Sequence, residues 1–191
     1  MKPKSNWLCG WMVLITLIIV SWIVFGCFCC ARAQEIPDWD KVIPIIIKIE
    51  SNGNPNAVSE DGCIGLMQIS PIVLKEYNAD RLFQKAKENK NSPSYGVAMV
   101  YGDNHFWDIC TYENYHLFVE DINVEIGTWY LKRIWFHYLP HYKIPQTVEN
   151  MLIAYNWGIG NLVKYIREPN KTLPKETKRY IAKYHTLAGR E

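Results

Sequence analysis

Cysteine is scarce in the part of the chain that can form a folded domain. Four of the six cysteines lie within the first 30 residues: Cys9, Cys27, Cys29 and Cys30. Residues 34–191 keep only Cys63 and Cys110, with no C-x-x-C pair and no Cys/His cluster of zinc-site spacing. We therefore expect no structural metal, and nothing in the sequence implies a cofactor.

A surplus of one charge sign is also lacking. The chain has 21 basic and 19 acidic residues, and Lys2, Lys4 and Arg32 are the basic ones before residue 34. Residues 34–191 therefore hold 18 basic and 19 acidic residues. Without a basic stripe, we expect no nucleic-acid partner. Internal repeats and long linkers are missing too, which indicates one domain over residues 34–191.

The longest stretch without charge lies at the N-terminus. Residues 5–31 carry no charged side chain, and "ARA" at residues 31–33 has the A-x-A cleavage pattern. The apolar run exceeds the ~7–15 residues of a signal h-region and reaches the ~20 that can span a bilayer. Two interpretations stay open: residues 1–33 are a cleaved signal peptide, or residues about 7–30 are a membrane anchor. A lipoprotein site ending at Cys27 is disfavoured, because Phe25 is bulky for it.

Either interpretation gives the same location for the domain. Lys2 and Lys4 hold the N-terminus on the cytoplasmic side. Residues 34–191 are therefore expected outside the cytoplasmic membrane, in the periplasm or on the cell-wall side, either secreted or anchored.

Apolar periodicity predicts a mainly helical domain. Turn-forming residues dominate 51–65, so we expect a loop there, with a small strand or hairpin element near 57–69. Ser70 and Pro71 are typical of a helix start, and residues 85–94 are expected to form a polar loop. The predicted helices span residues 40–50, 71 to about 77, 121–139, 147–158, 161–167 and 174 to about 187.

Glu50 stands out because it ends the apolar segment "VIPIIIKIE". At the carboxyl end of a helix, the partial negative charge of unpaired carbonyls disfavours a carboxylate. Burial disfavours the charged form as well, so both effects raise the pKa. A carboxyl group that stays protonated near neutral pH can act as a general acid. An exposed glutamate at a helix end is the structural alternative.

Three motifs, in a fixed order along the chain, favour the general acid over the exposed glutamate as the interpretation of Glu50. "ESNGNPNAVS" with "GCIGLMQI", then "AYNWGIGNL", then "ETKRYIAKY" resemble the signatures of the lytic transglycosylases related to goose-type lysozymes. The resemblance covers about residues 42–185. It implies a lysozyme-like fold of the α+β type, mainly helical, that acts on peptidoglycan glycan strands.

The resemblance also implies roles for single residues. Glu50 matches the sole catalytic acid/base of the family, and Ser51 follows it as in many members. Gln68 matches a glutamine that lines the sugar subsites. Tyr155 matches a tyrosine that hydrogen-bonds near the catalytic carboxyl, and Asn156 matches an asparagine beside it. We expect Glu50 to be catalytic and the other four to bind substrate.

Other motif residues have ordinary structural explanations. Met67 fits the core beneath the cleft, and Tyr180 fits the core as well. Glu176 fits the first turn of a helix, where the helix dipole favours an acid. Trp157 stands where the family has a small residue, and it either fills a gap or stacks on a sugar.

The reaction implied by the resemblance needs one carboxyl group. Glu50 would protonate the β-1,4 bond between N-acetylmuramic acid and N-acetylglucosamine. As a carboxylate it would then take the proton of the muramoyl C6 hydroxyl, which closes on C1 to give a 1,6-anhydro end. Two alternatives stay open: a muramidase or chitinase in which Glu60 or Asp61 positions a water, and a non-catalytic wall-binding module. By analogy, a secretion or conjugation machine is a possible partner.

One segment departs from the family. The spacing from Gln68 to Asn123 is about twice the typical length, which places an insertion at about residues 79–120. Its aromatic residues could add a wall to the cleft or form a small separate core. Cys110 lies in this insertion, and its pairing with Cys63 is left open.

Overall fold

The computed structural model describes residues 36–88 and 111–189. By its contacts the chain divides into two units, residues 1–36 and 37–191, and the fold described below is that of the second. The predicted leader and its cleavage pattern lie outside the described residues. Within the described residues no helix is both long and apolar enough to cross a membrane.

The described part is mainly helical, as predicted. Its helices are α2 (Trp39–Glu50), α3 (Pro71–Glu88), the 3-10 helix η1 (Asn114–Phe118), α6 (Glu120–Arg133), the π-helix η2 (Ile134–Tyr138), α7 (Leu139–His141), α8 (Val148–Trp157), α9 (Ile159–Arg167) and α10 (Lys175–Ala188). Two helix starts carry side-chain caps: the Ser70 Oγ, at the predicted start of α3, accepts from the Val73 N–H at 3.3 Å, and the Thr147 side chain accepts from the Asn150 N–H at 3.2 Å.

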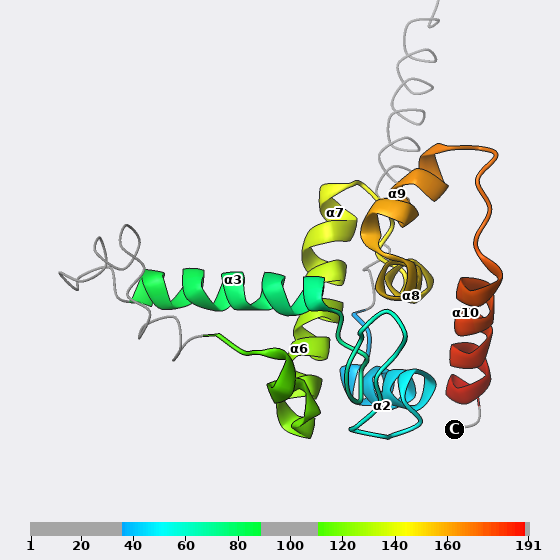
Figure 1. Cartoon of the computed structure of the whole chain (residues 1–191). Helices are drawn as coiled ribbons and strands as arrows, with labels where there is room; N and C mark the ends of the chain where they lie inside the picture. The colour runs from blue at the N-terminus through cyan, green and yellow to red at the C-terminus, as the bar shows by residue number, and fades with distance from the viewer. Residues whose placement is uncertain (1–35, 89–110, 190–191) are drawn as a thin grey trace, which may run out of the picture. The chain divides into compact units, whose positions relative to one another are not determined.

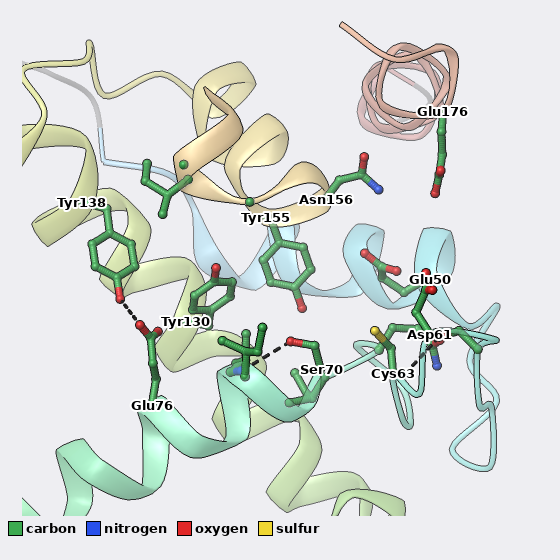
Figure 2. Close-up of a pocket in the computed structure, with 18 residues that line it drawn as sticks. Glu50, Asp61, Cys63, Ser70, Glu76, Tyr130, Tyr138, Tyr155, Asn156 and Glu176 are labelled. Carbon is green, nitrogen blue, oxygen red and sulfur yellow. Dashed lines mark hydrogen bonds between the residues drawn. The ribbon is translucent and has the colours of Figure 1, made fainter. Parts of the chain in front are cut away.

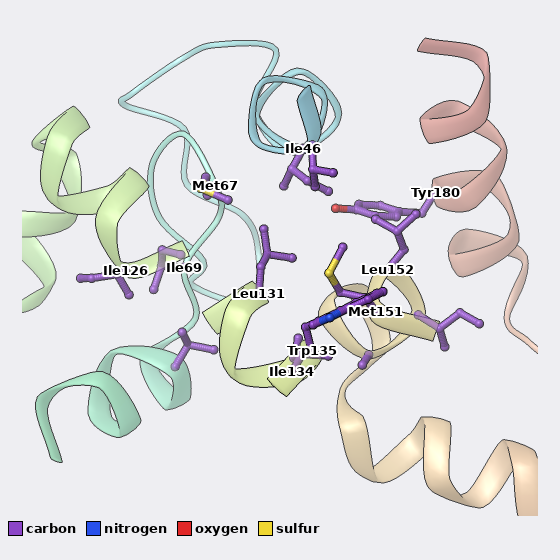
Figure 3. Close-up of a cluster of buried hydrophobic side chains, with 14 of the residues drawn as sticks. Ile46, Met67, Ile69, Ile126, Leu131, Ile134, Trp135, Met151, Leu152 and Tyr180 are labelled. Carbon is purple, nitrogen blue, oxygen red and sulfur yellow. The ribbon is translucent and has the colours of Figure 1, made fainter. Parts of the chain in front are cut away.

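The core forms where α2, α8 and α10 meet the α6–η2 segment. Helix α10 packs against α2 and α8, and η2 packs against α8 (Figure 1). Figure 3 shows Ile46 of α2, Leu131 of α6, Trp135 of η2 and Met151 of α8 directed into one cluster. All four side chains are almost fully buried. Burial of such side chains is the main term that stabilises the fold, at roughly 1.5–3 kcal/mol for each large apolar side chain.

The helix predicted over residues 121–139 is not one regular helix. Helix α6 ends at Arg133, and η2 follows, with the Leu139 N–H bonded to the Ile134 carbonyl five residues earlier. Ile134 and Trp135, at the start of this wide turn, are both buried in the core. The N-cap position of α6 is occupied by Val119.

The helix after Ser70 is much longer than predicted. It was expected to end near Tyr77, and residues 85–94 were expected to form a loop, but α3 continues to Glu88. Residues 79–88 read "ADRLFQKAKE", and most of them are good helix formers. The loop prediction rested on the polar residues from Lys85 onward, of which those up to Glu88 extend the helix instead. The tip of the predicted insertion, residues 89–110, lies outside the described residues. Cys110 is among them, while Cys63 carries a free thiol.

The loop between α2 and α3 has the compact antiparallel pairing that was expected near residues 57–69. It consists of single bridges, Val58 with Ile64 and Ile64 with Ile69, and no longer strand forms in the described residues. Ile64 and Ile69 exchange backbone hydrogen bonds at 3.1 and 2.9 Å. The loop is therefore folded back on itself beside the end of α2.

Candidate active site

A cleft of about 510 Å³ runs past the end of α2 (Figure 2). Glu50 and Glu176 lie at one end, Tyr155 lies in the middle, and Glu76 and Tyr138 lie at the other end. The residues described as lining it include no lysine, arginine or histidine. Among the described residues, those that line it are Glu50, Ser59, Asp61, Cys63, Gln68, Ile69, Ser70, Ile72, Val73, Glu76, Tyr130, Tyr138, Tyr155, Asn156, Gly158, Ile159, Gly160 and Glu176.

Glu50 has the electrostatics of a general acid. The pKa of its carboxyl group is raised from 4.5 to about 7. Burial is the largest cause, and the negative charge of the nearby Glu176 also raises the pKa. The hydrogen bond from Tyr180 and the charge of Lys183 act in the opposite direction and lower it. A carboxyl group with a pKa near 7 is populated in both protonation states at neutral pH, so it can give a proton and take one back.

Tyr180 supplies the hydrogen bond to this carboxyl group. Its hydroxyl donates to Glu50 Oε1 at 2.8 Å. Burial and the neighbouring Glu50 raise the pKa of the Tyr180 hydroxyl well above its ordinary value, so it stays a donor. Tyr180 was expected to lie in the core. It is buried there, at 6% exposure, and it also contacts the candidate acid.

Tyr155 lies beside the same site but bonds elsewhere. Its hydroxyl donates to the Met67 carbonyl at 2.8 Å. Burial first, and Glu50 second, raise the pKa of the Tyr155 hydroxyl well above its ordinary value. Tyr155 thus lies near the candidate acid Glu50, while the direct hydrogen bond to Glu50 comes from Tyr180.

The loop that carries Gln68 is fixed from below by Asn123. The fully buried Asn123 side chain accepts from the Met67 N–H at 2.8 Å and donates to the carbonyls of Ile64 and Leu117 at 2.9 and 2.8 Å. Gly65, at φ +82°, lets this approach occur, because a Cβ there would overlap the Asn123 amide and the Leu117 carbonyl.

Gly127 has a matching role one turn further along α6. A Cβ at Gly127 would overlap the Met67 side chain, which is fully buried as expected. Asn123 and Gly127 of the "N-x-x-x-G" pattern therefore hold the loop under the cleft, the first through hydrogen bonds and the second through close packing with Met67.

The other predicted binding residues differ in their placement. Gln68 lines the cleft, with φ +48° and its Nε2 donating to the carbonyls of Ala57 and Gly65 at 3.2 and 3.0 Å. Asn156 lines it too, and its side chain has no hydrogen-bond partner among the described residues (Figure 2). Ser51 does not line it: its hydroxyl donates to the Ile47 carbonyl at 3.3 Å and accepts from the Gly53 N–H at 3.2 Å.

Of the two loop acids considered for hydrolysis, only Asp61 lines the cleft. Glu60 is exposed and lies outside the lining. Trp157 is half-buried outside the lining, with the Lys171 ammonium 5.6 Å from its ring centroid. Sequence reasoning gave no role in the cleft to Ser59, Glu76, Tyr130 or Tyr138. They come from a loop and three different helical elements, so no local motif could have indicated them.

No group of three or more His, Cys, Asp or Glu side chains with metal-binding geometry occurs among the described residues.

Comparison with protein families identifies the chain. The model of the transglycosylase SLT domain matches residues 30–178, which include α2, the loop after it, α8 and the first turn of α10. A comparison with curated proteins gives no significant match. Because the matched segment is most of the chain, this protein belongs to the SLT-domain family of lytic transglycosylases that act on peptidoglycan.

Proposed function

We propose that this protein is a lytic transglycosylase that cleaves the β-1,4 bond between N-acetylmuramic acid and N-acetylglucosamine and leaves 1,6-anhydromuramic acid ends. One observation carries the proposal: the Glu50 carboxyl lies in the cleft with a pKa raised to about 7 by burial. Family membership supplies the substrate class, peptidoglycan.

The reaction follows from the two protonation states of Glu50. The protonated carboxyl group gives its proton to the glycosidic oxygen, and the C1–O bond breaks as the N-acetylglucosamine side leaves with a new hydroxyl. The muramoyl ring passes through an oxocarbenium-like state. The Glu50 carboxylate then takes the proton of the C6 hydroxyl while O6 bonds to C1. Glu50 is protonated again, and no water is consumed.

The neighbouring residues are proposed to serve substrate and acid separately. Gln68, Tyr155 and Asn156 face the cleft and are assigned to substrate binding. Tyr180 is a positioning residue, since it holds the Glu50 carboxyl through its hydroxyl. The Ser51 hydroxyl makes two hydrogen bonds to the backbone and so stabilises the turn after α2. These bonds support a structural role for Ser51 more than contact with substrate.

A hydrolase is the second candidate, because Asp61 lines the same cleft as Glu50. A second carboxylate could activate a water, as in ordinary glycosidases. The raised pKa of Glu50 serves either reaction, and it argues against a non-catalytic module, which gains nothing from a buried acid.

Mass analysis of the products of purified peptidoglycan separates the candidates. Transglycosylation gives muramoyl ends that are one water lighter than hydrolysed ends. Reducing muramic acid as the main product would replace the proposal with a hydrolase. If the protein releases no soluble product from any type of peptidoglycan, both candidates are overturned.

The substrate also requires that the domain lies outside the cytoplasm, since peptidoglycan does. We propose that residues 1–33 deliver it there, as a cleaved signal peptide or as an anchor. Protease added to intact spheroplasts should digest residues 34–191, and full protection would contradict this location.

A further inference from the structure

The cleft has a second group of polar side chains at the end away from Glu50. Figure 2 shows Glu76 of α3, Tyr130 of α6 and Tyr138 of η2 gathered there, with Tyr155 between them and Glu50. None of the three belongs to a motif that carries the family resemblance, and the proposed reaction does not use them.

Glu76 and Tyr138 are held by a chain of hydrogen bonds. The Tyr138 hydroxyl donates to Glu76 Oε1 at 2.8 Å and accepts from Arg133 Nε at 3.1 Å. Arg133 is paired with Asp80 at 3.5 Å, and the Trp129 indole also donates to Asp80 at 3.1 Å. Because the Tyr138 oxygen accepts from a guanidinium, its own proton is directed at Glu76. The carboxylate is therefore presented in a fixed orientation.

Two polar atoms in this group remain without a hydrogen-bond partner in the described part of the chain. They are Oε2 of Glu76 and the hydroxyl of Tyr130, and both residues line the cleft. Burial, with Glu76 and then Tyr138 nearby, raises the pKa of the Tyr130 hydroxyl, so it stays a neutral donor and acceptor. Hydroxyls of a ligand would satisfy both atoms.

The charge of the cleft indicates which ring would bind there. Its titratable lining includes the carboxyl groups of Glu50, Asp61, Glu76 and Glu176 and, among the described residues, no cation. An N-acetylmuramic acid ring carries a lactyl ether on O3, with either a carboxylate or a peptide attached. An N-acetylglucosamine ring keeps a free O3 hydroxyl and is neutral, so it can donate to a carboxylate without repulsion.

We propose that Glu76, Tyr130 and Tyr138 form a second sugar subsite that selects an N-acetylglucosamine ring of the bound strand, at the end of the cleft away from the cleaved bond. Glu76 accepts from ring hydroxyls, and Tyr130 exchanges a further hydrogen bond. The exposed Ile72 and the partly exposed Ile159 supply apolar surface in the cleft for the faces of the sugar rings. The inference rests on the proposed function for its substrate class.

Binding of neutral tetra-N-acetylchitotetraose to the Glu50→Gln protein tests the subsite without any cleavage. Adding Tyr130→Phe should weaken the affinity about 3- to 10-fold, the usual effect of losing one hydrogen bond. Its melting temperature should be unchanged, since the hydroxyl has no partner to lose among the described residues. Tyr165→Phe, on α9 outside the cleft lining, is the matched control and should have no effect.

Two further measurements locate the effect. Glu76→Gln should also weaken the tetrasaccharide affinity, and its melting temperature should be recorded because Tyr138 loses a charged partner. Backbone amide shifts on binding should include residues 72–76 and 130–138. Unchanged affinity in Tyr130→Phe and Glu76→Gln, or amide shifts confined to the Glu50 end, would overturn the subsite. Failure of the unmodified protein to cleave wall would overturn the proposed function and leave this binding result standing.

Discussion

The Tyr180 hydroxyl donates to Glu50 Oε1 at 2.8 Å, which joins the last helix of the domain to the first described one across 130 positions of sequence. A donor to the carboxylate stabilises the charged form, while burial stabilises the neutral form. The two effects oppose each other, and burial prevails to give a pKa of about 7. The packing of α10 against α2 thereby sets the protonation state of the candidate acid.

Glu50→Gln should lower wall-lytic activity by roughly 10²-fold or more, because the amide keeps the size of the side chain and cannot deliver a proton. Release of soluble muropeptides from purified peptidoglycan measures this. Glu149→Gln is the matched control, since Glu149 is exposed on α8 outside the cleft lining. Near-normal turnover by Glu50→Gln would contradict the mechanism.

The activity should decline as the pH rises through about 7, where Glu50 loses its proton. Tyr180→Phe removes a hydrogen bond that lowers the pKa of Glu50, so the alkaline limb of the profile should move to higher pH. Glu176→Gln removes a neighbouring negative charge that raises this pKa, so the limb should move to lower pH. The measurement is kcat/KM against pH for the three proteins, and shifts of the same sign in both variants would contradict the assigned electrostatics.

Glu50→Gln should also make the protein more stable at alkaline pH. The folded-state pKa of about 7 lies above the ordinary value of 4.5, so the folded state binds more protons than the unfolded state between these pH values. Stability from Glu50 is present in full below pH 4.5 and is lost as the pH rises to about 7. The loss can reach roughly 3 kcal/mol, and the glutamine variant does not suffer it.

Urea unfolding at pH 4 and pH 8 measures this difference. The free energy of unfolding of Glu50→Gln should exceed that of the unmodified protein at pH 8 and match it within about 1 kcal/mol at pH 4. A difference that is the same at both pH values would mean that Glu50 is not held in the protonated form.

The sequence was sufficient to indicate Glu50 as a candidate acid, because its signal is local: a carboxyl group at the end of an apolar helix, inside a recognisable motif. It was not sufficient to divide the roles of Tyr155 and Tyr180. Both are aromatic residues in motifs, and which hydroxyl reaches Glu50 depends on how α8 and α10 pack against α2. That packing is a tertiary property without a local pattern.

The far end of the cleft shows the same limit. Glu76, Tyr130 and Tyr138 are separated along the chain and come together because α3 packs against α6 and η2 continues α6. The length of α3 was underestimated because its second half is polar, although polar residues with high helix propensity extend a helix when one face is packed. Periodicity alone could not distinguish this segment from a loop.

The buried amide of Asn123 makes three hydrogen bonds, two with the loop after α2 and one with η1. Asn123→Ala leaves the Met67 N–H and the Leu117 carbonyl without this partner and opens a small cavity. The Ile64 carbonyl loses one of its two hydrogen bonds and keeps the one from the Ile69 N–H. Since each unsatisfied buried group costs about 1–3 kcal/mol, the free energy of unfolding should fall by roughly 2–4 kcal/mol, allowing for partial relaxation. Activity should fall as well, because Gln68 and the Met67 carbonyl that holds Tyr155 lie on the released loop.

Asn150→Ala is the matched control for Asn123→Ala. The Asn150 amide donates to the Pro145 carbonyl at 2.8 Å in an exposed setting, so water can replace it and the loss of unfolding free energy should stay below about 1 kcal/mol. Urea unfolding of both variants, with wall-lytic activity measured below the onset of unfolding, checks the difference. Equal losses in the two variants would mean that the loop is held by its own turns and that Asn123 has no special part in shaping the cleft.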